Sequence, residues 1–113
     1  MRFNNVFYKD SYFEWDEIKN DENVKKHGIS FFEAITVFDD DDALYKSDEE
    51  HSIDEDRFII IGWSNSASLL VVCHCYKEED TVIRIFSARA ATKTEEKQYG
   101  DALWKIITIL PEL

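Results

Sequence analysis

The pattern of polar and apolar positions predicts a helix soon after the start of the chain. Residues 16–28 read DEIKNDENVKKHG, with Asp16 suited to cap the first turn and acidic residues within that turn. Gly28 follows where a left-handed residue commonly ends a helix. The last turn is basic, with Lys25, Lys26 and His27, which suits the negative end of the helix dipole.

A second helix is predicted directly afterwards, in SFFEAITVF at 30–38. Ser30 and Glu33 have the spacing of a capping box, in which each side chain bonds the backbone N–H of the other. Apolar residues then repeat at the spacing of a buried helical stripe: Phe31, Ala34, Ile35 and Phe38. The chain should therefore have two N-terminal helices joined by HGI.

Three apolar runs rich in β-branched residues predict strands at 57–64, 69–77 and 81–88. Their connections, NSAS and EED, are short enough for hairpins, so an antiparallel meander is expected. Residues 1–12 contain scattered aromatic residues. We interpret them as a short segment that precedes the domain, with an edge strand as the alternative. The expected sheet is antiparallel and three- to four-stranded.

A terminal helix completes the predicted fold. Thr92 and Glu95 form a second capping box, and the helix ends near Pro111. Its apolar face comprises Tyr99, Leu103, Ile106, Ile107 and Leu110. The predicted order is helix, helix, three strands, helix, which is an α+β fold with helices packed against a small sheet.

Composition is consistent with one globular domain over 1–113. The chain has 113 residues, of which 44% are hydrophobic, with three glycines and one proline. It has no apolar run of the roughly 18 residues that a membrane span needs, and its start lacks the apolar core of a signal peptide. We expect a soluble, cytoplasmic protein without a membrane partner.

The net charge of −11 comes mostly from one segment. Residues 39–56 hold ten acidic residues and one lysine, a charge of −9, so the other 95 residues carry −2. A strongly acidic chain is a poor partner for a polyanion. Because the acidity is local, this objection to nucleic-acid binding is weakened but still stands.

Cysteine and aspartate clusters do not predict a metal site. Cys73 and Cys75 point to the same side of a strand, which suits free thiols in a reducing compartment better than a disulfide. His74 points to the other side, so CHC cannot close a tetrahedral zinc site by itself. The run 39–42, DDDD, lacks the spacing of a calcium loop. We expect no metal and no cofactor.

Arginine on the third predicted strand is the first candidate for chemistry. Ile83 and Ile85 face one side of the strand, and Arg84 faces the other. A guanidinium group on a rigid strand suits a phosphate, because it binds two oxygens and keeps its charge. Pairing with one of the many carboxylates is the alternative, and composition favours it.

Histidines near basic residues are the second candidate. His51 and Arg57 bracket the acidic loop, where a histidine could move a proton beside a phosphate-binding arginine. His27 follows Lys26 at a helix end, where the helix dipole already explains a cation. Ordinary surface roles remain open for all of these residues.

The sequence resembles the BrnT-type toxin family in three blocks that cover about residues 13–99. The first block is FEWDEIKNDENVKKHGISFFEAITVF, the second is HSIDEDRFIIIGWS and the third is IRIFSARAATKTEEKQY. Three blocks in this order and spacing are more specific than one short motif. On this resemblance, 1–12 and 100–113 are extensions of the family domain.

The resemblance implies a RelE-like fold and the toxin half of a type II toxin–antitoxin pair. Such proteins are ribonucleases that inhibit translation until bound by an antitoxin, a ribbon-helix-helix protein that also binds DNA. Contact with DNA would then be indirect. The implied chemistry is metal-independent RNA cleavage, in which the 2′-hydroxyl attacks the adjacent phosphate.

The resemblance also implies roles for individual residues. Basic positions that would hold the phosphate are Arg57, Arg84 and Arg89. His27 and His51 are the candidate proton-transfer groups, and which of them acts as base is open. The residues that would orient these groups or contact RNA are Lys26, Glu55 and Tyr99.

Departures from the family pattern motivate an alternative. Ala67 and Ser68 stand where the family usually has Gly-Arg, and Lys77 or a neighbour replaces an arginine near the end of the second strand. Fewer cations mean fewer phosphate contacts. The alternative is a weakly active or inactive toxin-like domain that serves as a protein-binding co-repressor partner of the DNA-binding antitoxin.

Overall fold

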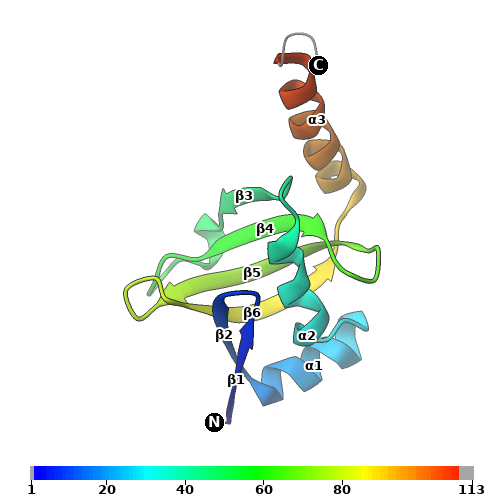
Figure 1. Cartoon of the computed structure of the whole chain (residues 1–113). Helices are drawn as coiled ribbons and strands as arrows, with labels where there is room; N and C mark the ends of the chain where they lie inside the picture. The colour runs from blue at the N-terminus through cyan, green and yellow to red at the C-terminus, as the bar shows by residue number, and fades with distance from the viewer. Residues whose placement is uncertain (1, 110–113) are drawn as a thin grey trace.

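The computed structural model describes residues 2–109, with side chains described to Leu103. A six-stranded sheet has the order β1-β2-β6-β5-β4-β3. In chain order the elements are β1 (Phe3–Tyr8), β2 (Ser11–Asp16), α1 (Glu17–His27), α2 (Phe31–Ala34), the 3-10 helix η1 (Ile35–Asp39), β3 (Leu44–Ser47), the 3-10 helix η2 (Glu49–His51), β4 (Phe58–Trp63), β5 (Leu69–Lys77), β6 (Val82–Ala90) and α3 (Lys93–Ile109). The fold is α+β, as predicted, and Figure 1 shows α3 extending away from the sheet.

The predicted antiparallel sheet of three or four strands was wrong. A β1–β2 hairpin precedes the helices, and β2 pairs with β6 in parallel, so the sheet is mixed. Lys9 and Asp10 make the hairpin turn with φ of 45° and 68°, the left-handed conformations that tight hairpins require. A further strand, β3, lies within the acidic segment that was predicted to be a loop.

The first predicted helix is confirmed with both of its ends. Asp16 accepts a hydrogen bond from the backbone N–H of Ile18 at 3.0 Å. Gly28 has φ 72°, and its N–H reaches the carbonyl of Val24. The second helix is shorter than predicted, because α2 ends at Ala34 and the chain continues as the 3-10 helix η1.

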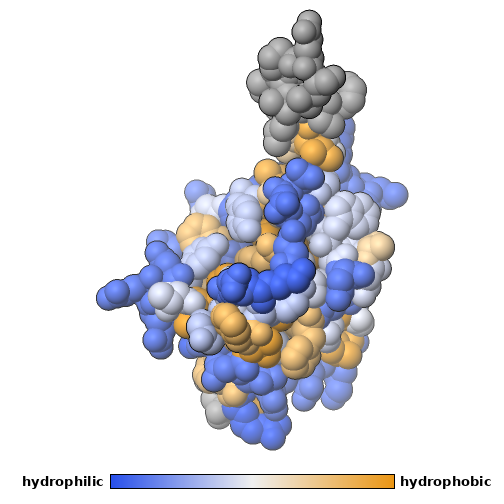
Figure 2. Space-filling view, viewed as in Figure 1, coloured by the Kyte–Doolittle hydropathy of each residue, from blue (hydrophilic) through white to orange (hydrophobic). Residues whose placement is uncertain are grey.

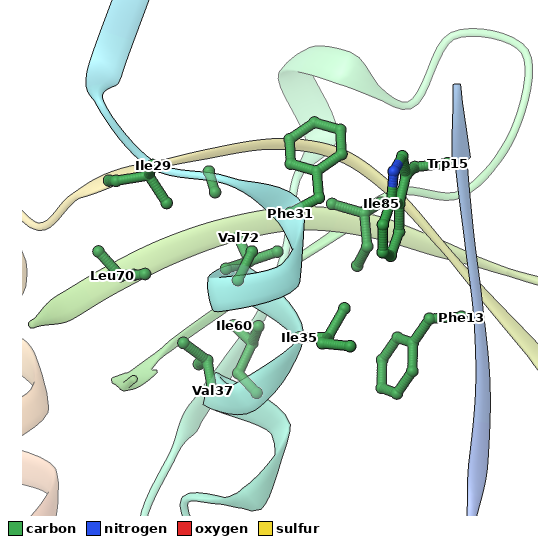
Figure 3. Packing of buried hydrophobic residues seen from close by; sticks show 12 residues of the cluster. Phe13, Trp15, Ile29, Phe31, Ile35, Val37, Ile60, Leu70, Val72 and Ile85 are labelled. Atoms are coloured by element: carbon green, nitrogen blue, oxygen red, sulfur yellow. The ribbon is translucent and has the colours of Figure 1, made fainter. Parts of the chain in front are cut away.

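Covering one face of the sheet, α2 and η1 bury the main core. We call this the helix face. Its largest fully buried side chains include Phe13, Trp15, Phe31, Ile60, Leu70 and Ile85, and Figure 3 shows them meeting between α2 and the strands. Seen from the side drawn in Figure 2, the surface is mostly hydrophilic, with smaller hydrophobic areas between the polar ones.

Asn23 attaches α1 to the part of β6 that β2 does not reach. Its amide nitrogen donates to the carbonyl of Ala88 at 2.8 Å, and its oxygen accepts from the N–H of Ala88 at 3.1 Å. The buried side chain thus replaces a missing strand partner. This contact holds Lys19, one turn earlier on α1, beside the middle of β6.

A β-bulge in β6 decides where its arginines point. The register with β5 shifts between Cys73 and His74, which leaves Phe86 without a partner. Arg84 and Arg89 are five residues apart and would face opposite sides of a regular strand. Because the bulge shifts the alternation by one, both lie on the face opposite the core, which we call the open face.

The N-terminal part of α3 is docked, and its capping box is confirmed. Thr92 Oγ1 accepts from the N–H of Glu95 at 3.2 Å, and Glu95 Oε1 accepts from the N–H of Thr92 at 2.9 Å. Tyr99 is buried against Ile61 and Val71 on the open face. The side chains of Ile106 and Ile107, and residues Leu110 and Pro111, lie outside the described part. No helix within the described residues is long and apolar enough to span a membrane.

Candidate functional site

The open face is hollowed into a cleft between β4, β5, β6 and η2. The cleft has a volume of about 340 Å³ and a floor of Ile59, Val71 and Cys73. The charged and titratable side chains around this floor are Lys19, Asp48, Glu50, His51, Arg57 and Arg89. Three cations and a histidine therefore converge here, although the chain as a whole is strongly acidic.

Asp48 orients His51 at the rim of the cleft. The Nδ1 of His51 lies 2.9 Å and 3.0 Å from the two carboxylate oxygens of Asp48. Burial alone would raise the pKa of Asp48, but hydrogen bonds from His51 and Cys73 outweigh this and lower the pKa below its ordinary value. An ionised Asp48 accepts a hydrogen bond from the Nδ1–H of His51, which leaves Nε2 of His51 as the atom that can exchange protons.

Ser52 fixes the segment that carries this pair. Its hydroxyl donates to the carbonyl of Asp48 at 2.6 Å and accepts from the N–H of Arg57 at 2.9 Å. The N–H of Asp48 in turn donates to the carbonyl of Arg57 at 2.8 Å. These bonds hold His51 and Arg57 on one compact turn, so their relative position does not depend on the rest of the acidic segment.

The guanidinium group of Arg57 lies over an aromatic ring inside the cleft. The carbon of its guanidinium group is 3.8 Å from the centre of the Phe86 ring, a close cation–π contact. Its Nη2 is 3.5 Å from Glu55, and its Nε is buried with no hydrogen-bond partner among the described residues. The bulge that exposes Phe86 on this face thus also provides the platform for Arg57.

Arg89 is held by a carboxylate from α3. Its two terminal nitrogens donate to the two oxygens of Glu95 at 2.7 Å and 2.9 Å. The bond from Arg89, with help from the backbone of Thr92, lowers the pKa of Glu95 to about 2. The fork of Arg89 is therefore occupied by its own chain, and a phosphate must compete with Glu95 for it.

Arg84 and Glu55 lie on the open face but outside this cleft. Arg84 pairs with Glu14 of the neighbouring β2, with Nε 2.6 Å from the carboxylate. Glu55 pairs with Lys77 and with Arg57. The arrangement expected from composition, arginines paired with carboxylates, is thus present at all three strand-associated arginines.

His27, Lys26 and Tyr99 are not brought to the cleft. His27 ends α1 eight residues after Lys19, about 12 Å along the helix axis. Lys26 precedes it at the same end of the helix. Tyr99 is buried, and its hydroxyl donates to Asp40 at 2.8 Å, so burial and this bond raise its pKa. These three positions remain sequence-based predictions.

The cysteines are free and buried. Burial, with a hydrogen bond to Asp48, raises the pKa of Cys73 to about 12, and burial also raises the pKa of Cys75. Both thiols therefore stay protonated and poorly nucleophilic. Among the residues described, no group of three or more histidine, cysteine or carboxylate side chains could hold a metal ion.

The cleft residues that were not predicted as site residues include Lys19, Asp48 and Phe86. Asp48 could have been found from its i, i+3 spacing to His51 in DEEH. Lys19 and Phe86 carry no comparable signal, because their positions depend on how α1 meets β6 and on the bulge.

The fold and the cleft define a class: a small α+β domain with a histidine and several cations on the uncovered face of a mixed sheet. A family model for the ribonuclease toxin BrnT of type II toxin–antitoxin systems matches residues 15–95. Since this match spans most of the chain, the protein belongs to the BrnT family of ribonuclease toxins.

A solved structure agrees with this assignment. The crystal structure of the Brucella abortus ribonuclease toxin BrnT, at 1.1 Å resolution, aligns with a TM-score of 0.55. The alignment has 22% sequence identity and covers 70% of this chain and 94% of that chain. At this identity the likeness concerns the fold. A comparison with curated proteins found no match.

Proposed function

We propose that this protein is an endoribonuclease toxin of a type II toxin–antitoxin pair, which cleaves RNA without a metal ion and so inhibits translation. Family membership supports the ribonuclease class. The observation that carries the proposal is the cleft, where the Asp48–His51 pair lies beside Arg57, Arg89 and Lys19. A proton acceptor next to several cations suits attack on a phosphodiester.

In the proposed reaction the 2′-hydroxyl of RNA attacks the adjacent phosphorus. Nε2 of His51 takes the hydroxyl proton, and Asp48 stabilises the imidazolium that results. The new 2′-O–P bond forms as the bond from phosphorus to the 5′-oxygen breaks. Lys19 gives a proton to that 5′-oxygen, and the product carries a 2′,3′-cyclic phosphate. We assign this role to Lys19 rather than His27, because Lys19 lines the cleft.

Cationic side chains would stabilise the phosphorane. Arg57 is held over the ring of Phe86, so its charge is positioned before substrate binds. Arg89 would exchange Glu95 for a phosphate oxygen. Arg84, farther along the same face, would contact a neighbouring nucleotide. An antitoxin that covers the open face would block all three arginines, and we expect a ribbon-helix-helix protein as this partner.

The proposal is tested with purified protein, fluorescently labelled RNA and EDTA. We expect cleavage to a cyclic phosphate product, and we expect His51→Ala to lower kcat about 10²- to 10⁴-fold. Lys97→Ala, which alters an exposed lysine on α3, is the matched control and should leave the rate unchanged. Absence of cleavage by the wild type, or equal rates for His51→Ala and the control, would contradict the mechanism.

A second candidate function has one observation in its favour. Each of the three strand-associated arginines is paired with a carboxylate of the same chain: Arg57 with Glu55, Arg84 with Glu14, Arg89 with Glu95. A weakly active domain that acts as a co-repressor partner of its antitoxin would need no free phosphate site. Growth arrest upon expression without the antitoxin would rule against this function.

A further inference from the structure

Aromatic side chains of the β1–β2 hairpin stand exposed on the open face, outside the cleft. Phe3 is 41% exposed, Phe7 59% and Tyr12 56%. Phe7 and Tyr12 are a cross-strand pair whose ring centres are 4.6 Å apart. Exposed aromatic residues that cluster on one face commonly mark an interaction surface. The family match begins at Trp15, so all three lie outside it.

Strand β6 connects these rings to the cleft. Its first residue, Val82, lies beside Tyr12, and Arg89 near its other end lines the cleft, about 20 Å away along the strand. Between them, the guanidinium group of Arg84 lies 4.6 Å from the centre of the Phe3 ring. From the hairpin turn toward the cleft, the register therefore places Phe7 and Tyr12 first, then Arg84 with Phe3 beside it, and then Phe86 under Arg57.

We propose that this line binds single-stranded RNA where the strand continues out of the cleft. We call it the stacking track, made of Phe3, Phe7, Tyr12, Arg84 and Phe86. Bases stack on aromatic rings and on guanidinium planes with little dependence on sequence. The proposal rests on the proposed function, because it assumes that RNA binds in the cleft. It adds that the bound RNA is single-stranded.

The pairing of Arg84 with Glu14 predicts how RNA binding to the stacking track depends on salt. Because Glu14 neutralises this arginine, Arg84 offers a stacking plane with little net charge. Binding there should depend weakly on salt. In the cleft, by contrast, Lys19 makes no ion pair among the described residues, so its contact with a phosphate should contribute to the salt dependence of binding. One bound RNA would thus be held by stacking at one end and by charge at the other.

The test is fluorescence anisotropy with 2′-O-methyl oligoadenylates, which lack the attacking hydroxyl and stay intact. One probe has about four nucleotides and the other about twelve. We expect the double variant Phe7→Ala/Tyr12→Ala to bind the long probe about tenfold more weakly and the short probe equally well. Lys19→Ala should weaken both probes and lower the salt slope by about 0.7.

Two further variants make the result specific. Tyr45→Ala removes an aromatic residue of similar exposure, 53%, on β3 at the opposite edge of the sheet, and should change neither affinity. Tyr12→Leu keeps an apolar residue in the hairpin but removes the ring, so it should weaken the long probe without unfolding the hairpin. Equal effects on both probes, or none on the long one, would overturn the track.

The same experiment separates the track from the proposed function. Anisotropy measures binding without cleavage, so an inactive wild type would contradict the nuclease mechanism and leave the length-dependent effect measurable. Sedimentation of the free protein tests a protein occupant instead. If the wild type self-associates and Phe7→Ala/Tyr12→Ala is monomeric, the rings are a contact between protein chains and the track is overturned.

Discussion

The same strands form both faces of the sheet, but their residues have different roles on the two faces. On the helix face, Trp15 and Ile85 are buried in the hydrophobic core under α2 and η1. On the open face, the intervening residues Glu14 and Arg84 form an ion pair, next to exposed rings. Neighbours in sequence thus serve stability on one side and binding on the other. The open face keeps charges that a stability argument would not place there, and this points to function.

The largest expected effect is a difference in stability between substitutions on the two faces. Trp15→Ala empties a fully buried site on the helix face and should lower the free energy of unfolding by about 3–5 kcal/mol. Phe7→Ala, on the adjacent strand but on the open face, should cost less than about 1 kcal/mol. Denaturant titration measures both. Similar losses for the two variants would mean that the faces are not distinct.

The helix face also contains a buried histidine. His74 is fully buried among Phe38, Tyr45, Phe58 and Tyr76, and its Nδ1 is 3.1 Å from the carbonyl of Val72. Burial lowers its pKa from 6.5 to about 4. Below pH 6.5 the unfolded chain takes up this proton while the folded chain does not. Stability from this group is retained above pH 6.5 and lost as the pH falls toward 4.

The corresponding measurement is the free energy of unfolding as a function of pH. A shift from 6.5 to about 4 corresponds to a loss of about 3 kcal/mol over that range. His74→Phe keeps an aromatic ring in the cluster and removes the titrating group, so its stability should fall less steeply. Parallel curves for the wild type and His74→Phe would show that His74 does not titrate as its burial implies.

The parts of the fold that could be predicted are those set by local sequence signals. Local signals sufficed for α1, with Asp16 and Gly28 at its ends, and for the capping box of Thr92 and Glu95. The alternation of β6 also placed Arg84 opposite Ile85. These predictions hold because each depends on residues close in sequence.

Features set by distant residues could not be predicted in this way. In β2, buried Phe13 and Trp15 alternate with outward residues, but the strand needs β6, about 70 residues later, to complete its pairing. The bulge at Phe86 arises from the register with β5, and it decides the direction of Arg89. The resemblance to a family identified the arginines as candidate site residues. Asp48 and Lys19 were identified as cleft residues only from the folded structure.

Asp48 offers the sharpest test of the open face. Asp48→Asn keeps the shape of the side chain but no longer favours a proton on Nδ1 of His51, so kcat should fall about 10- to 100-fold with little change in KM. Glu50→Gln removes a cleft carboxylate with no hydrogen bond to His51 among the described residues and is the matched control. Kinetics of RNA cleavage measure both. A change in KM alone would indicate that Asp48 acts on RNA binding.

The smallest expected effect tests whether carboxylates of the open face restrain its arginines. Glu95→Gln retains a side chain that can cap α3 but removes the charge that holds Arg89. We expect RNA to bind and be cleaved a few-fold better, with a stability loss within about 1 kcal/mol. Glu96 is the next residue, and its one ion pair within the described residues is to exposed Lys93 at 4.0 Å, so Glu96→Gln should change neither property. If Glu95→Gln instead lowers activity, the carboxylate positions Arg89 for the substrate, and the ion pair is part of the site rather than a restraint on it.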